Sequence, residues 1–128
     1  MKRSLVGLLL LFTGIVAAKT SIEYDSVAAA LSELKAKPDT KTQNRDGWTF
    51  VTESVDGAFV MWTFTPHGHP AHPSVVKRRI FEEGESVRME MQVLCESVDP
   101  VCDGLVEDFN ALNQGLVESI KARKKASQ

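Results

Sequence analysis

The chain has 128 residues, a length that suits a single domain, and 43% of its residues are hydrophobic. With 15 Lys and Arg residues against 17 Asp and Glu residues, its formal net charge at pH 7 is −2. Because nucleic-acid-binding domains carry strongly basic surfaces, this charge balance argues against a nucleic-acid partner.

Residues 1–18 have the three-part pattern of a secretory signal peptide. Two basic residues begin it, an uncharged leucine-rich stretch covers residues 5–16, and the small residues Ala17 and Ala18 suit a signal peptidase. The alternative is a membrane anchor, which needs about 20 apolar residues. Lys19 ends the apolar stretch before that length is reached, so a removable signal peptide is the prediction.

Cleavage after Ala18 would leave residues 19–128 as one α+β domain with no stable membrane anchor. Removal of Lys2 and Arg3 lowers the basic count from 15 to 13 against 17 acids, so the net charge moves from −2 to −4. The predicted location is the periplasm or the medium outside the cell.

Residues 21–37 have the periodicity of an amphipathic helix. Apolar side chains recur at the spacing of one helix face, at Val27, Ala30, Leu31 and Leu34. Asp25 or Ser21 is expected to cap the start of this helix, and Pro38 is expected to end it. The polar, turn-rich residues 38–47 are then predicted to form a loop.

Two β-hairpins are predicted next. Asp56-Gly57 separates residues 48–55 from residues 58–65, and Asp-Gly favours a tight type I′ turn. Residues 75–82 are expected to pair with residues 87–95 in the same way.

The last strand alternates between apolar and mostly polar side chains, which predicts one dry face and one wet face. A two-residue Gly-Glu turn would place Arg79 opposite Glu90 and Ile80 opposite Met89. This register also directs the cationic Arg78 to the dry face. A register shifted by one residue is the alternative.

A long helix is predicted over residues 103–124, with Asp103 as its N-cap. Its apolar stripe is Leu105, Phe109, Leu112, Leu116 and Ile120. The predicted fold is therefore α+β. It consists of a four-stranded antiparallel meander, with the N-terminal helix and the long C-terminal helix packed on one face.

Cys95 and Cys102 are the two cysteines of the chain. In an oxidising compartment an even pair of cysteines indicates a structural disulfide. The alternative is a redox pair, which usually has the tighter C-x-x-C spacing at the start of a helix.

The three histidines, His67, His69 and His72, lie in the proline-rich loop of residues 66–74. Such a cluster suggests zinc or copper binding through neutral imidazoles, although the spacing is not that of a structural zinc site. The prolines favour extended backbone, which would spread the side chains apart. A plain connecting loop and a loop that contacts a protein or peptide are therefore the other two interpretations.

Basic residues follow this loop on the next strand. Lys77 and Arg79 lie on one strand face, where they would form either a solvated surface or a contact surface for an anion. The first hairpin has aromatic residues on both faces, so either each face is covered or one is exposed to a partner. No catalytic motif such as G-x-S-x-G occurs, and no catalytic residue is assigned.

The stretch from Trp62 to Arg79, followed by Leu94-Cys95 and Cys102-Asp103, resembles a small uncharacterised periplasmic protein family of Gram-negative bacteria. The resemblance covers about half of residues 19–128, and its most specific part is the proline–histidine loop. It implies a periplasmic location and a paired cysteine, and it carries no established activity.

The predicted function is non-enzymatic binding of a protein or peptide in the cell envelope. The contact residues expected from the sequence are Pro70, His72, Lys77 and Arg79. The alternative is a periplasmic zinc- or copper-binding protein that uses His67, His69 and His72.

Overall fold

The protein has an α+β fold in which five antiparallel strands follow one another in the sheet in sequence order. The structure is a computed structural model that describes residues 22–127, so the predicted signal peptide, residues 1–18, lies outside the described residues. The elements are α1 (Val27–Ala36), β1 (Lys41–Arg45), β2 (Trp48–Val55), β3 (Ala58–Phe64), β4 (Ser74–Glu83), β5 (Ser86–Cys95) and α2 (Asp99–Ala126).

The sheet has one strand more than the sequence predicted. β1 lies in the segment that was expected to be a loop, and all five of its side chains are exposed. It pairs with β2 through its backbone, with Lys41 opposite Thr52 and Arg45 opposite Trp48. Asp46 and Gly47 make the turn with positive φ angles of 52° and 84°. A strand without apolar side chains has no period-two pattern, so its only local signal was the Asp46-Gly47 pair.

Both predicted hairpins are confirmed. Asp56 and Gly57 have φ angles of 50° and 79°, and Val55 lies directly opposite Ala58, as a tight type I′ turn requires. In the second hairpin Arg79 pairs with Glu90, and Ile80 with Met89. The unshifted register is therefore the correct one.

The helices begin at different residues from those predicted. Ser26 caps α1, because its hydroxyl accepts a hydrogen bond from the backbone N–H of Ala29 at 3.1 Å. Asp25 is therefore not the cap, and Ser21, the other predicted cap, lies outside the described residues. α2 begins at Asp99 instead of Asp103. Pro100 lies in its first turn, where the missing N–H of proline costs no hydrogen bond.

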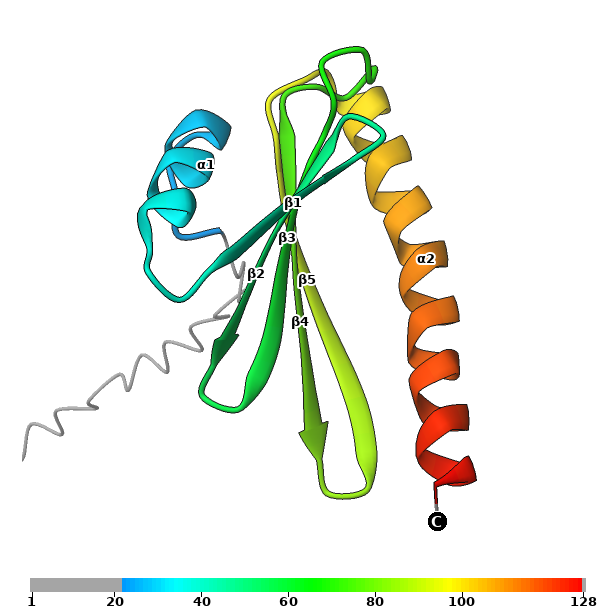
Figure 1. Ribbon diagram of the computed structural model, residues 1–128. Helices are drawn as coiled ribbons and strands as arrows, with labels where there is room; N and C mark the ends of the chain where they lie inside the picture. The colour runs from blue at the N-terminus through cyan, green and yellow to red at the C-terminus, as the bar shows by residue number, and fades with distance from the viewer. Residues whose placement is uncertain (1–21, 128) are drawn as a thin grey trace, which may run out of the picture.

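The two helices lie on opposite faces of the sheet, so the prediction that both pack on one face is wrong. Figure 1 shows the sheet edge-on between α1 and α2. Leu34 of α1 packs in a cluster with Val51 and Trp62, whereas Phe109 of α2 packs in a second cluster with Val76. The central strands bury successive residues, so both of their faces need a cover.

Candidate ligand-binding site

The loop of residues 66–74 is folded back on itself at the end of the sheet. The backbone N–H of His69 donates to Pro66 O, and that of His72 donates to His69 O, each at 3.0 Å. The hydroxyl of Ser74 donates to the carbonyl oxygen of Ala71, which is fully buried. The loop therefore consists of successive turns, and the expectation of an extended loop is wrong.

The three histidines of this loop have different environments. His72 Nδ1 donates to Thr65 O at 3.0 Å, and its ring lies 4.6 Å from the ring of His67. His69 Nδ1 instead accepts from the N–H of Ala71 at 3.0 Å, and its ring meets that of Trp48 edge-on at 5.2 Å. Within residues 22–127 no three His, Cys, Asp or Glu side chains gather where they could hold a metal ion. The structure thus does not assemble the three-histidine set expected for zinc or copper.

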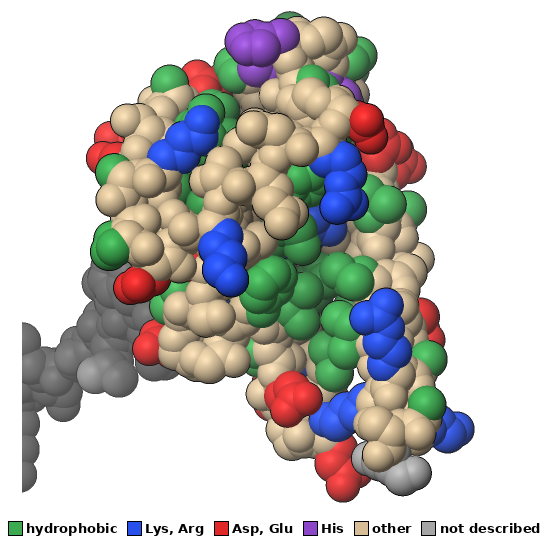
Figure 2. All heavy atoms as spheres, in the orientation of Figure 1, with side chains coloured by type: hydrophobic (Ala, Val, Ile, Leu, Met, Phe, Trp, Pro, Cys, Tyr) green, Lys and Arg blue, Asp and Glu red, His purple; other side chains and the backbone are tan. Residues whose placement is uncertain are grey.

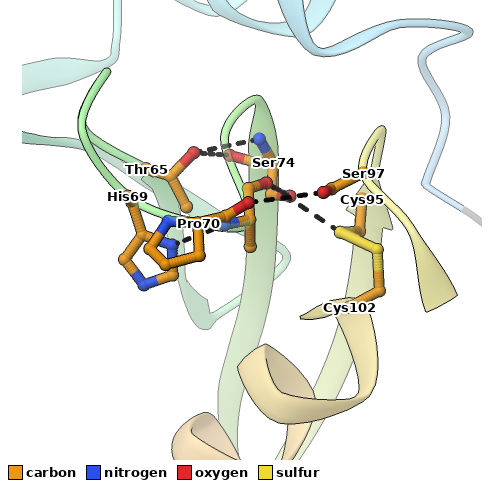
Figure 3. Close-up of a disulfide and its surroundings, with 8 residues drawn as sticks. Thr65, His69, Pro70, Ser74, Cys95, Ser97 and Cys102 are labelled. Atoms are coloured by element: carbon orange, nitrogen blue, oxygen red, sulfur yellow. Dashed lines mark hydrogen bonds between the residues drawn. A yellow bond between two sulfur atoms is a disulfide. The ribbon is translucent and has the colours of Figure 1, made fainter. Parts of the chain in front are cut away.

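The predicted disulfide between Cys95 and Cys102 is confirmed. It joins the end of β5 to the first turn of α2, directly beside the loop of residues 66–74, which we call the histidine loop (Figure 3). The hydroxyl of Ser97 donates to Pro70 O at 3.3 Å, and the N–H of Glu96 donates to Pro73 O at 3.0 Å. This junction therefore holds the loop, β5 and α2 in one arrangement.

Replacement of both Cys95 and Cys102 by alanine is expected to lower the free energy of unfolding by about 2–2.5 kcal/mol. The bridge closes a short loop, with a sequence separation of 7. On the chain-entropy model, closing a loop of this length lowers the entropy of the unfolded chain by an amount equivalent to about 2–2.5 kcal/mol. Urea unfolding of the variant and the wild type measures the difference. Equal stability of the two proteins would contradict the proposed role of the bridge.

The predicted contact residues Lys77 and Arg79 lie on the face of the sheet that α1 covers in part. Lys77 forms an ion pair with Glu23 and lies over the ring of Trp62, 4.9 Å from its centre. Arg79 pairs with Glu90 at 3.2 Å. Among the described residues, no hydrogen bond or ion pair links either cation to Pro70 or His72. The structure therefore does not unite the four predicted contact residues in one site.

A pocket of about 350 Å³ lies between the sheet and α2, and we call it the α2 pocket. Its lining comes from β2, β3, β4, the histidine loop and α2. In Figure 2, hydrophobic side chains gather in the strip between the sheet and α2. The lining residues are Trp48, Phe50, Thr63, His69, Arg78, Leu105, Asp108, Phe109 and Leu112.

Arg78 is the unusual member of this lining, because only 7% of its surface is exposed. Its terminal nitrogens contact only neutral acceptors. The contacts with oxygen are long, at 3.4 Å to Thr63 Oγ1 and 3.5 Å to Asn113 Oδ1, and the third is to the weak acceptor Met61 Sδ at 3.2 Å. Its Nε has no hydrogen-bond partner in the described part of the chain. The guanidinium carbon lies 5.0 Å from the centre of the Phe109 ring.

No carboxylate of the described residues forms an ion pair with Arg78. The ion pairs found in residues 22–127 involve Lys37, Lys77, Arg79, Arg88 and Lys124, but not Arg78. Burial removes water from the guanidinium, and this desolvation lowers the pKa of Arg78 below its ordinary value. A buried, unpaired cation beside an apolar pocket is therefore the main electrostatic feature of this face.

The sequence contained a signal for this site. Arg78 falls at a position that the strand alternation assigns to the dry face, and a buried charge is so unfavourable that it argued for a shifted register. The structure has the unshifted register, and Arg78 is buried. The conflict between the strand pattern and the charged residue type therefore marked the site.

Comparisons with known protein families, with curated proteins and with solved structures find no match to this chain. Neither helix described in residues 22–127 is both long and apolar enough to cross a membrane.

Proposed function

We propose that this protein is an exported, non-enzymatic binding protein that holds an anionic group of its ligand in the α2 pocket. The observation that carries the proposal is the burial of Arg78, which is only 7% exposed and yet has no carboxylate partner among the described residues. Buried charges in proteins are usually paired, because an isolated one costs several kcal/mol. A bound anion would supply the missing partner.

The rest of the lining supports binding over covalent chemistry. The titratable side chains of the pocket are His69, Arg78 and Asp108, and its other members are apolar or, for Thr63, a hydroxyl. His69 Nδ1 already accepts a backbone hydrogen bond, so this nitrogen is not free to act as a base. A concave, mostly apolar site with a few polar groups is typical of ligand recognition.

Export is supported by two independent features. The leader pattern of residues 1–18 is that of a secretory signal peptide. The disulfide between Cys95 and Cys102 is of the kind that persists in oxidising compartments such as the periplasm.

The proposed partner is still a protein or peptide in the cell envelope, but we propose that it binds to Arg78 instead of to the surface of Lys77 and Arg79 that the sequence predicted. Lys77 and Arg79 already have acidic partners, whereas Arg78 has none among residues 22–127. Of the histidine loop, His69 is the member that borders the pocket. The loop thus contributes one wall, and β4 contributes the charge.

Nuclear magnetic resonance of the mature domain tests this proposal, because the two tryptophans report on opposite faces. Trp48 lines the α2 pocket, whereas Trp62 is buried on the α1 face. Titration with a panel of apolar carboxylates, sulfonates and phosphates is expected to shift the indole N–H signal of Trp48 and leave that of Trp62 in place. The proposal fails if no anion of the panel shifts Trp48 at millimolar concentration.

Arg78→Met is expected to abolish these shifts without weakening the fold. Methionine keeps most of the apolar stem, and removal of an unpaired buried charge leaves stability unchanged or raises it by up to about 2 kcal/mol. Thermal unfolding measures this effect, and Arg79→Met on the opposite face is the matched control, with anion binding retained. A loss of stability in Arg78→Met alone would mean that Arg78 serves the fold instead.

A further inference from the structure

We infer that the group held by Arg78 is a carboxylate joined directly to an apolar body. This inference rests on the proposed function, since it names the ligand chemistry of the same pocket. Three features of the α2 pocket carry it: its charge, the free edge of its guanidinium, and its apolar walls.

The charge of the pocket favours a monoanion. Arg78 is the one permanent cation in the lining, and Asp108 brings a negative charge to the same pocket. Asp108 is exposed and forms no ion pair with Arg78, so it does not neutralise the buried cation. A phosphate dianion would leave one negative charge unbalanced in apolar surroundings and would also be repelled by Asp108.

The guanidinium has an edge that lacks a charged partner among residues 22–127 and has the geometry for two parallel hydrogen bonds. Nε is without a partner among residues 22–127, and the terminal nitrogens meet only neutral acceptors. The contacts with Thr63 Oγ1 and Asn113 Oδ1, at 3.4 and 3.5 Å, are long for charged donors, and the third contact, at 3.2 Å, is to the weak acceptor Met61 Sδ. A carboxylate offers two coplanar oxygens at the spacing of such an edge. The stacking of Arg78 on Phe109 at 5.0 Å holds the guanidinium beside the pocket.

The walls select the body of the ligand. Trp48, Phe50, Leu105, Phe109 and Leu112 surround the site, and Leu112 is 58% exposed, so it offers apolar surface that a ligand would cover. A volume of about 350 Å³ is at the lower end of small-ligand sites. It suits a carboxylate with one large apolar side chain or a short acyl chain.

Two sources can present this chemistry: the C-terminal residue of a peptide and a free apolar acid. Matched pairs of probes separate them. The first pair is an N-acetylated tripeptide ending in phenylalanine, with either a free C-terminal carboxylate or an amide. The second pair is octanoate and octanol, and phenyl phosphate serves as the dianion.

Calorimetry and the Trp48 signal are expected to show binding of at least one of the two carboxylates, with its neutral partner about 30-fold weaker or more. Which carboxylate binds identifies the source. Arg78→Met should lose the same factor, whereas Arg78→Lys, which keeps the charge but lacks the planar edge, should retain part of the affinity. Asp108→Asn should strengthen phenyl phosphate binding several-fold and leave the carboxylate nearly unchanged.

Two outcomes overturn the inference while the proposed function stands: equal affinity of acid and amide when both depend on the α2 pocket, or tighter binding of phenyl phosphate than of either carboxylate by the wild type. Absence of binding by every anion would remove the proposed function as well. The two failures are therefore distinguishable in one set of titrations.

Discussion

Trp62→Ala is expected to lower the free energy of unfolding by about 3–5 kcal/mol. Trp62 is 1% exposed and lies in the cluster between the sheet and α1. Its ring meets Tyr24 at 5.5 Å, and its Nε1 donates to Glu53 at 3.3 Å. Truncation removes this packing and leaves a cavity that the surrounding β-branched side chains cannot fill.

Urea unfolding followed by circular dichroism measures the loss. Phe59→Ala is the matched control, because Phe59 is an aromatic residue on the same strand but is 44% exposed, and its truncation should cost less than about 1 kcal/mol. Since small domains have only about 5–15 kcal/mol of stability, the Trp62 variant is expected to unfold at a much lower urea concentration. Similar losses for the two variants would show that the α1 face is not the packed core described above.

Phe109→Ala is expected to cost a similar amount, about 3–5 kcal/mol, and to damage the α2 pocket at the same time. Phe109 is 4% exposed and is one of the two buried residues of α2. It lies 6.1 Å from the ring of Trp48 and supports the guanidinium of Arg78. Its loss therefore weakens the docking of the helix and the positioning of the charge together.

The control for this variant separates stability from binding. Leu112→Ala, one turn further along α2, removes a pocket residue that is 58% exposed, so stability should change by less than about 1 kcal/mol. Carboxylate affinity should nevertheless fall, because the ligand loses an apolar contact. If Leu112→Ala unfolds the domain while Phe109→Ala does not, the assignment of core and pocket on this face is wrong.

The two faces of the sheet thus have different roles in the proposed function. The α1 face is closed by a cluster that includes Leu34, Trp62 and Val75, each at most 1% exposed. On the other face, α2 buries Leu105 and Phe109 in its first half and leaves the α2 pocket beside them. A well-packed face provides rigidity, and a partly covered face provides room for a ligand.

Several local features could be predicted because their causes lie within a few residues. Asp-Gly at 56–57 predicts a tight turn, and this turn sets the pairing of the first hairpin. The alternation of β5 predicts its two faces. Met91 and Val93 pack toward α2, whereas Leu94 packs toward α1. The even pair of cysteines, together with the predicted oxidising compartment, made the disulfide between Cys95 and Cys102 a prediction from the sequence.

The candidate site could be predicted only in fragments. His69 was singled out as a possible metal ligand, but its neighbours Trp48 and Ala71 determine where its ring and its Nδ1 are directed. Arg78 was recognised only as an inconsistency in the register. Nothing local to either residue indicated that a helix from the end of the chain would complete a pocket around them.

The amino-acid sequence by itself determined the turn and register of the first hairpin, which follow from short-range backbone preferences, and its even pair of cysteines predicted the disulfide. Only the tertiary structure decided that β1 joins the sheet, that α1 and α2 cover opposite faces, and that Arg78 is buried beside α2. These outcomes depend on burial summed over segments far apart in the chain. A sheet with apolar residues on both faces allows either placement of a helix until all the elements pack together.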